Sequence, residues 1–152
     1  MTGFWDGTFR PENKITRVEF LKLIFLVKNI TLSDDSKNYF SDIKDGFWHK
    51  KYVNTAINLW IVSVSNKNFN PNSNISKAES LKMAIMLFVW NIDNKYSLDF
   101  LDVKEWDWFW KYVDYAVKNN LIAYSWKYFY PNNFISRREV VWILYVLSWY
   151  WK

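Results

Sequence analysis

The sequence predicts an all-α fold made of helix–loop–helix units, and three repeating features carry the prediction. The three prolines lie 60 residues apart, at Pro11, Pro71 and Pro131. Each is followed by a Ser or Thr and, three residues later, a Glu, which is the start pattern of a helix. Upstream of the last two prolines, apolar residues recur at the three- and four-residue spacing of a helix.

The repeat extends well beyond the prolines. Ile15-Thr16-Arg17-Val18-Glu19 recurs twice at the same offset, and Phe40-Ser41-Asp42-Ile43 pairs with Phe100-Leu101-Asp102-Val103. The second motif has no counterpart ahead of residue 1. We therefore expect one composite domain of three segments: 1–31, the second half of a first unit, then the complete units 32–91 and 92–152.

The leading helix of each complete unit is predicted from its apolar positions. These follow helical spacing at Trp48, Tyr52, Val53, Ala56 and Ile57, and again at Trp108, Tyr112, Val113, Ala116 and Val117. Asp42 and Asp102 precede these helices, so we expect them first as helix N-caps and only second as ligands. Asn-rich Phe-x-Pro segments after the helices predict loops rather than strands.

The second helix of each unit begins with a capping box, in which a hydroxyl and a glutamate satisfy each other's backbone amides. The pairs are Thr16 with Glu19, Ser76 with Glu79, and Ser136 with Glu139. Because capping explains these glutamates, we expect structural supports there and not catalytic acids.

Composition excludes most enzyme chemistry. The 152 residues include no cysteine and one histidine, His49, which has no repeat counterpart and receives no function here. Thiol catalysis and thiolate zinc sites therefore drop out. Since neither a glycine-rich phosphate loop nor an EF-hand series occurs, we expect no enzyme activity, cofactor or metal, although calcium at Asp6 or Asp42 stays open.

Charge and hydropathy narrow the partners further. The net charge is +5, but the basic residues are spread along the chain, which argues against nucleic-acid binding. The longest apolar stretch, 140–151, is shorter than the roughly 20 residues of a bilayer span, so we expect no membrane insertion. The first residues lack the basic and apolar regions of an export signal. Oligomeric state stays open.

The order of an aromatic-x-Asp-aliphatic start, a Trp-Tyr helix, a Phe-x-Pro turn and Ile-Thr-Arg-x-Glu resembles the S-layer homology family over nearly the whole chain. The resemblance implies a pseudo-threefold, mostly helical domain. It also implies noncovalent anchoring of secreted surface proteins to cell-wall polysaccharide, often through pyruvylated sugars, at the cell surface. Residues 3–20 fit the family pattern best, whereas Lys77 stands where the family has Arg.

The candidate ligand-binding residues are Arg17, Lys77 and Arg137, at the first position of each long helix. A cation there costs about 0.3–1 kcal/mol against the helix dipole, so something should compensate. Free helix amides beside a cation would suit the carboxylate of a pyruvylated sugar. The alternative is that these cations pair with Glu or Asp at a unit junction. Trp48 and Trp108 either stack on sugar from the groove or belong to the core.

We therefore expect a binding module that holds an anionic, pyruvylated wall polysaccharide in grooves between repeats. One alternative is a helical repeat module that binds another protein through exposed aromatic side chains. A glycan-processing enzyme with paired carboxylates is a third reading, disfavoured because the recurring acids are caps.

Tryptophan is abundant and glycine scarce, with 11 and 3 residues respectively. Only Trp48 and Trp108 align between units, whereas Trp60 lies opposite Asn120, where a left-handed Gly or Asn normally ends a helix. We hypothesise that the other nine are UGA-encoded glycines in the natural protein, although Trp142, inside a helix, fits poorly. They are Trp5, Trp60, Trp90, Trp106, Trp110, Trp126, Trp142, Trp149 and Trp151.

Overall fold

The computed structural model describes residues 6–89, 91–92, 95, 98–123 and 127–149. Over these residues the fold is all-helical, as predicted, with three isolated β-bridges and no strand. The helices are α1 (Arg17–Lys28), α2 (Lys50–Asn58), α3 (Lys77–Phe88), α4 (Trp110–Lys118) and α5 (Arg137–Trp149).

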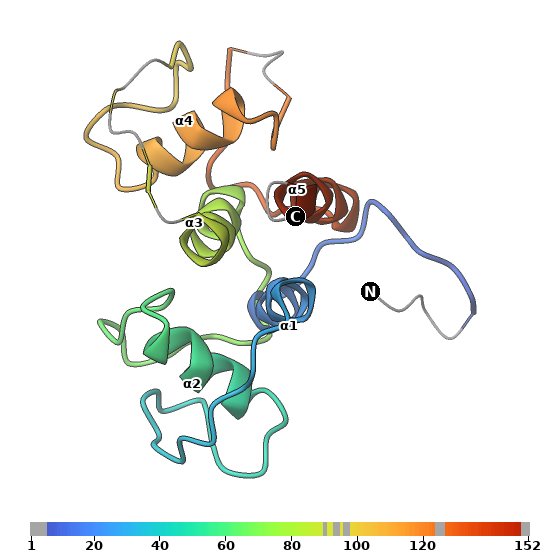
Figure 1. The fold of residues 1–152 in the computed structure, drawn as a ribbon, viewed down its shortest axis with the longest axis vertical. Coiled ribbons are helices and arrows are strands. Elements are labelled where there is room, and N and C mark those ends of the chain that lie inside the picture. The colour runs from blue at the N-terminus through green and yellow to red at the C-terminus, as the bar shows by residue number, and fades with distance from the viewer. Residues whose placement is uncertain (1–5, 90, 93–94, 96–97, 124–126, 150–152) are drawn as a thin grey trace.

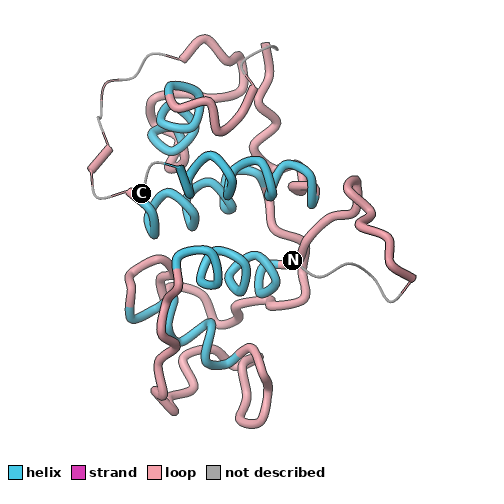
Figure 2. Tube along the Cα trace, turned by 45° about the vertical axis from the view of Figure 1, so that its right-hand side comes forward, coloured by secondary structure: helices cyan, strands magenta, loops and turns pink. Residues whose placement is uncertain are grey.

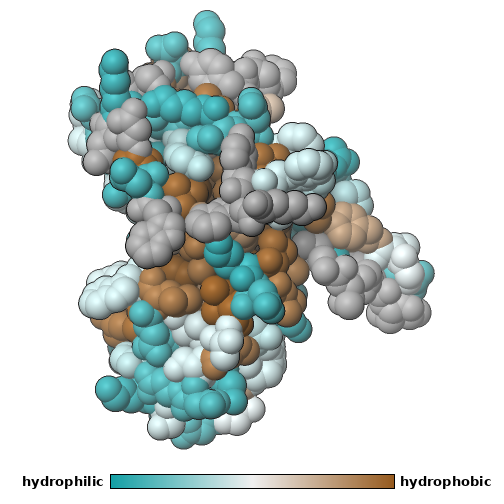
Figure 3. All heavy atoms as spheres, viewed as in Figure 1, coloured by the Kyte–Doolittle hydropathy of each residue, from teal (hydrophilic) through white to brown (hydrophobic). Residues whose placement is uncertain are grey.

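The three longer helices occupy the centre of the molecule and the two shorter ones lie outside them. Figure 1 shows α1, α3 and α5 nearly end-on, with α2 beside α1 and α4 beside α3. Figure 2 shows that long loops surround the two short helices. On the face seen in Figure 3, apolar side chains gather over the middle, and polar ones cover the lobes of α2 and α4.

A closed ring of backbone hydrogen bonds joins the three units. The first amide of each long helix donates to the loop of the next unit: Arg17 N to Ser73 O at 2.9 Å, Lys77 N to Asn133 O at 2.8 Å, and Arg137 N to Asn13 O at 2.9 Å. The third bond returns to the first unit. This closure is the pseudo-threefold arrangement that the family resemblance implied.

The core follows the same symmetry. Ile15, Ile75 and Ile135 are buried at the junctions between units. Val53 and Ala56 of α2 are buried, and so are the equivalent residues of α4, which confirms these positions of the predicted face. Trp48 and Trp108 lie ahead of the two helices, so their assignment to that face was wrong. In each complete unit an aromatic pair joins the leading segment to the Phe-x-Pro loop, with ring centroids 5.6 and 5.9 Å apart.

The capping boxes form at all three long helices. Thr16 and Ser76 each accept the Glu amide three residues on, and that Glu side chain accepts their own amide. Ser136 and Glu139 make the same reciprocal bonds. The expectation that Asp42 and Asp102 are helix N-caps was wrong, as their contacts show.

Asp42 does not cap a helix, because α2 begins eight residues later, at Lys50. Its carboxylate instead accepts the amides of Phe69, at 2.9 Å, and Asn70, at 2.7 Å. Asp102 does the same for the loop of the last unit. These aspartates therefore fix the Phe-x-Pro loops. The loop backbone forms no regular helix or sheet, so the carboxylates supply the hydrogen-bond acceptors for those amides.

Trp60 adopts the left-handed backbone expected of a helix-terminating Gly or Asn. Its φ is 60°, close to the 56° of the equivalent Asn120. The side chain is 84% exposed, so little packing compensates for this conformation. Of the other eight tryptophans without a repeat equivalent, Trp5, Trp90, Trp126 and Trp151 lie outside the described residues.

No helix among the described residues is long and apolar enough to cross a bilayer.

Candidate ligand-binding groove

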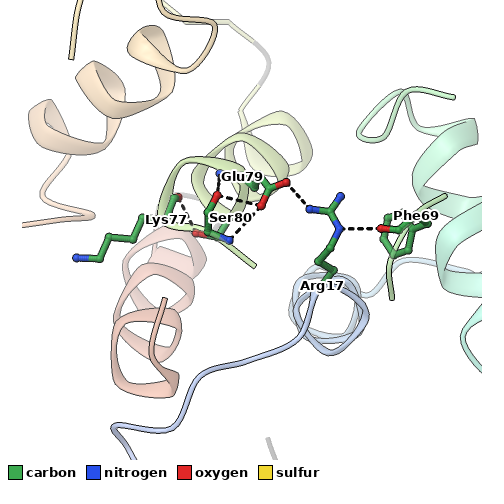
Figure 4. A network of polar contacts seen from close by, with 6 residues as sticks. Arg17, Phe69, Lys77, Glu79 and Ser80 are labelled. Carbon is green, nitrogen blue, oxygen red and sulfur yellow. Dashed lines mark hydrogen bonds and ion pairs between the residues drawn. The ribbon is translucent and has the colours of Figure 1, made fainter. Parts of the chain in front are cut away.

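The cations at the starts of the long helices lie at the junctions between units. Arg17 Nη1 is 2.5 Å from Glu79 Oε1, and Arg17 Nε donates to the Phe69 carbonyl at 3.0 Å (Figure 4). Lys77 Nζ lies 3.0 Å from Glu139 Oε1 and points away from Arg17. The contacts of Arg17 and Lys77 are thus those of the junction-pairing alternative.

Arg137 repeats the contacts that Arg17 makes with a Phe-x-Pro loop. Its Nε donates to the Phe9 carbonyl at 3.0 Å, and its guanidinium lies 4.9 Å from the centre of the Phe9 ring. Arg17 lies at the same distance over the Phe69 ring. In both cases the guanidinium connects a long helix to the phenylalanine of a Phe-x-Pro loop in another unit.

The helix amides that were expected to bind an anion are already used within the protein. At α1 the first two amides donate to the carbonyls of Ser73 and Pro71, and the third donates to the Thr16 hydroxyl. The corresponding amides of α3 and α5 donate to the equivalent carbonyls of the next unit and to their own capping serines. The expectation of free helix-start amides was therefore wrong, because closure of the ring consumes them.

The capping glutamates carry a second function at the junction. Glu79 accepts the Ser76 amide through Oε2 and pairs with Arg17 through Oε1. Burial raises the pKa of Glu79, but the Arg17 charge and the Ser76 hydrogen bonds outweigh it, and the pKa is lowered overall. For Glu139, burial is likewise outweighed by Ser136 and then Lys77, so its pKa is also lowered. Both carboxylates are held ionised.

A groove of about 700 Å³ opens between α3 and the last unit. Lys77 and Leu81 of α3 line one side, and Glu139 and Trp142 of α5 line the other. A second, more polar cavity of about 590 Å³ shares Lys77 and Glu139 with it. The Lys77–Glu139 pair therefore stands where the two cavities meet.

Two tyrosines line this groove and were not singled out from the sequence. Tyr128 and Tyr130 stack with ring centroids 5.6 Å apart, and they are 45% and 52% exposed. The equivalent residues of the preceding unit are Asn68 and Asn70. Overlaying the units reveals this aromatic gain in the last unit, but the overlay alone does not place it in a groove.

Trp48 and Trp108 are surface residues, so the core alternative for them was wrong. Each is 55% exposed and precedes its leading helix. Lys22 Nζ lies 5.3 Å from the centre of the Trp48 ring, and Lys82 Nζ lies 5.6 Å from that of Trp108. Lysine side chains from the neighbouring long helix thus cover one face of each indole.

The sequence profile of one family, the S-layer homology domain, matches residues 1–21, 39–79 and 99–141, which is more than half of the chain. The chain belongs to the S-layer homology family. Its repeats are the three matched segments, of which the first is partial.

The curated relatives are longer proteins. The chain is 33% identical over 130 residues to the cellulosome-anchoring protein of Acetivibrio thermocellus, covering 82% of this chain and 28% of that protein. It is 29% identical to exoglucanase XynX of the same organism and 28% identical to an amylopullulanase of Thermoanaerobacterium thermosulfurigenes. Those alignments cover 95% of this chain but 14% and 8% of the two enzymes.

An S-layer homology domain is a non-catalytic module that binds cell-wall polymers and anchors proteins at the cell surface. The family membership thus identifies this domain as a cell-surface anchoring module, and its ligand and binding residues have to be argued from its own grooves.

Proposed function

We propose that this domain holds an anionic, pyruvylated cell-wall polysaccharide noncovalently in the groove beside Lys77, and so anchors the protein that carries it. One observation supports this groove above the other junctions. A cavity of about 700 Å³ has an ammonium group on its wall and a stacked pair of half-exposed tyrosines beside it.

The chemistry of each group suits such a ligand. An ammonium group has three N–H donors, and the Glu139 contact engages Lys77 Nζ at 3.0 Å. A ligand carboxylate can take further donors of the same ammonium as a charge-assisted hydrogen bond. Lysine acts as a point charge, whereas arginine grips a carboxylate with two parallel bonds. Lys77 should therefore bind a carboxylate with less geometric demand than an arginine.

Aromatic side chains supply the rest of the contact. The broad, apolar faces of Tyr128 and Tyr130 can stack on the apolar face of a sugar ring, and their hydroxyls can bond to its hydroxyl groups. Trp142 on the opposite wall narrows the groove. If Trp142 is glycine in the natural protein, the groove is wider at this point and the two tyrosines carry the stacking.

The same proposal extends to the other two junctions with different residues. Arg17 and Arg137 take the place of Lys77 there, and each is bonded to a Phe-x-Pro carbonyl. Lys82 occupies in α3 the position of Trp142 in α5, so Trp108, which lies over Lys82, would border the junction of Arg17. By the same equivalence Trp48, beside Lys22, would border the junction of Arg137.

The test is co-sedimentation of the domain with purified wall sacculi, before and after chemical removal of their secondary polysaccharide. We expect pelleting that is lost on stripping, weakened by salt, and competed by free pyruvylated sugar. Lys77→Ala and Tyr128→Ala should weaken it, and Arg17→Ala with Arg137→Ala tests the other two junctions. Lys67→Ala, which removes an exposed lysine from the loop before Phe69, is the matched control.

Pelleting that survives both stripping and Lys77→Ala would contradict the proposal. Insensitivity to salt and to free sugar, together with capture by a surface protein, would instead favour the alternative of protein binding through the exposed indoles of Trp48 and Trp108.

A further inference from the structure

The start of α5 carries a cation where the other two long helices have a buried apolar residue. Arg138 takes the position of Val18 in α1 and Ala78 in α3, which are both 1% exposed. The backbone register is the same at all three positions, because each amide donates to the proline carbonyl of the next unit's loop. The Arg138 side chain is 70% exposed, so its guanidinium lies at the surface of the junction and not in the core.

Arg138 lines two cavities. It borders the groove of about 700 Å³ between α3 and the last unit, and it also borders the more polar cavity of about 590 Å³. Lys77 and Glu139 are the other residues that line both. The two cavities are therefore neighbours, and a chain of sugars that lies in the groove can continue past the Lys77 ammonium into the polar cavity.

The polar cavity has an excess of positive charge. Among the described residues that line it, Lys14, Lys77 and Arg138 are cations, and Glu12 and Glu139 are carboxylates. These charges come from all three units of the ring. Because the repeat equivalents of Arg138 are uncharged, the other two junctions lack a cation at this position. The cavity beside Lys77 thus attracts an anion with a group that is specific to this junction.

The ion pair that holds Arg138 is open to competition. Glu12 Oε1 contacts Arg138 Nη2, and the two side chains are 69% and 70% exposed. Water and salt screen an exposed pair of this kind, so it binds Arg138 only weakly. A guanidinium has five N–H donors in a planar fork, and it can hold a phosphate or carboxylate with two parallel hydrogen bonds. An anionic ligand can therefore share Arg138 with Glu12 or replace Glu12.

We propose that the polar cavity is a second subsite, in which Arg138 and Lys14 bind an oxyanion on the sugar residue next to the one held at Lys77. The oxyanion is a phosphate or a second carboxylate. The identity of the polymer rests on the proposed function. The second subsite makes the Lys77 junction selective for a polysaccharide with anionic groups on consecutive residues, because a chain with a single charge leaves Arg138 paired with Glu12.

The first test measures this subsite without the wall. Inorganic phosphate and, separately, acetate are titrated into the whole chain, and the amide NMR signals of the cavity residues should shift saturably. The anion that binds more tightly identifies the group. Arg138→Val, which copies the residue of α1, should raise the dissociation constant at least about tenfold. Lys14→Asn should raise it as well. Lys51→Ala, which breaks an exposed pair with Asp34, is the matched control.

Glu12→Gln separates a ligand site from a structural ion pair. This variant removes the competing carboxylate, so the anion should bind about two- to fivefold more tightly. A pair with only a structural role would give no tightening. In co-sedimentation with wall sacculi, Arg138→Val should weaken pelleting and Glu12→Gln should strengthen it.

Saturation by neither anion would overturn the proposal, and so would equal dissociation constants for the parent and Arg138→Val. Pelleting that depends on Lys77 but not on Arg138 would also overturn it, while leaving the anchoring function in place. A parent domain that does not pellet at all contradicts the proposed function instead, and the anion titrations then decide on the second subsite alone.

Discussion

Trp60→Gly should stabilise the domain, because the native backbone there suits glycine and the indole packs on little. A left-handed conformation costs an L residue about 1–2 kcal/mol, and Trp60 has a φ of 60°. Glycine loses more backbone entropy on folding, about 0.5–1 kcal/mol, which offsets part of the gain. The side chain is 84% exposed, so its removal forfeits little buried area.

The expected net stabilisation is about 0.5–1 kcal/mol. At this chain length 1 kcal/mol corresponds to about 2–4 °C in Tm, so scanning calorimetry should detect a rise of about 1–4 °C. Trp106→Gly is the matched control, because Trp106 is equally exposed but has no positive φ. It should leave the Tm unchanged or lower it.

A lower Tm for Trp60→Gly would refute the reasoning, and so would an equal rise for both variants. The result also bears on the nine unmatched tryptophans. Reading their codons in the genome decides the matter independently: UGA is expected at these positions, and UGG ends the hypothesis.

Three further predictions concern the side chains that fix the junctions and the loops. Folding lowers the pKa of Glu79 and Glu139, so these carboxylates should contribute fully to the free energy of unfolding above their ordinary pKa of 4.5. Their contribution should disappear as the pH falls through the pKa values of the folded state. Urea denaturation of the parent and of Glu79→Gln should therefore give converging stabilities in acid. Asp42→Ala should cost about 1–3 kcal/mol by leaving two loop amides without their carboxylate. In the same urea denaturation assay Asp34→Ala, which breaks an exposed pair with Lys51, should leave the midpoint nearly unchanged. Ser76→Ala should cost about 0.5–2 kcal/mol through loss of the cap, and a Ser76→Thr variant that fails to restore the stability would count against capping as the cause.

Local chemistry explains why so much of the helix pattern could be predicted. A capping box involves residues three apart, and an amphipathic face involves residues three and four apart, so both are written in short stretches of sequence. The starts of the long helices, the buried face of α2 and the left-handed position of Trp60 follow from such patterns. The spacing of 60 residues then extends each local prediction to every unit.

The site was harder to predict because its groups meet across units. Arg17 and Glu79 are 62 residues apart in the chain, and Arg137 lies 128 residues from the Phe9 carbonyl that it contacts. The sequence marked Arg17, Lys77 and Arg137 as cations that need compensation, but it could not choose between a ligand carboxylate and a glutamate of the next unit. It also predicted free helix-start amides, which are in fact bonded to the loop of the next unit and to the capping hydroxyl.

The sequence by itself determined the repeat, the helical class, the capping of each long helix and the family. Only the tertiary structure decided which groups remain for a ligand or partner. Closing three units into a ring pairs Arg17 and Lys77 with glutamates of the next unit and opens a groove beside Lys77. Folding within each complete unit brings Asp42 and Asp102 to the loop amides. Those outcomes depend on contacts between segments that are far apart in the sequence, and the local pattern of residues around each side chain does not determine them.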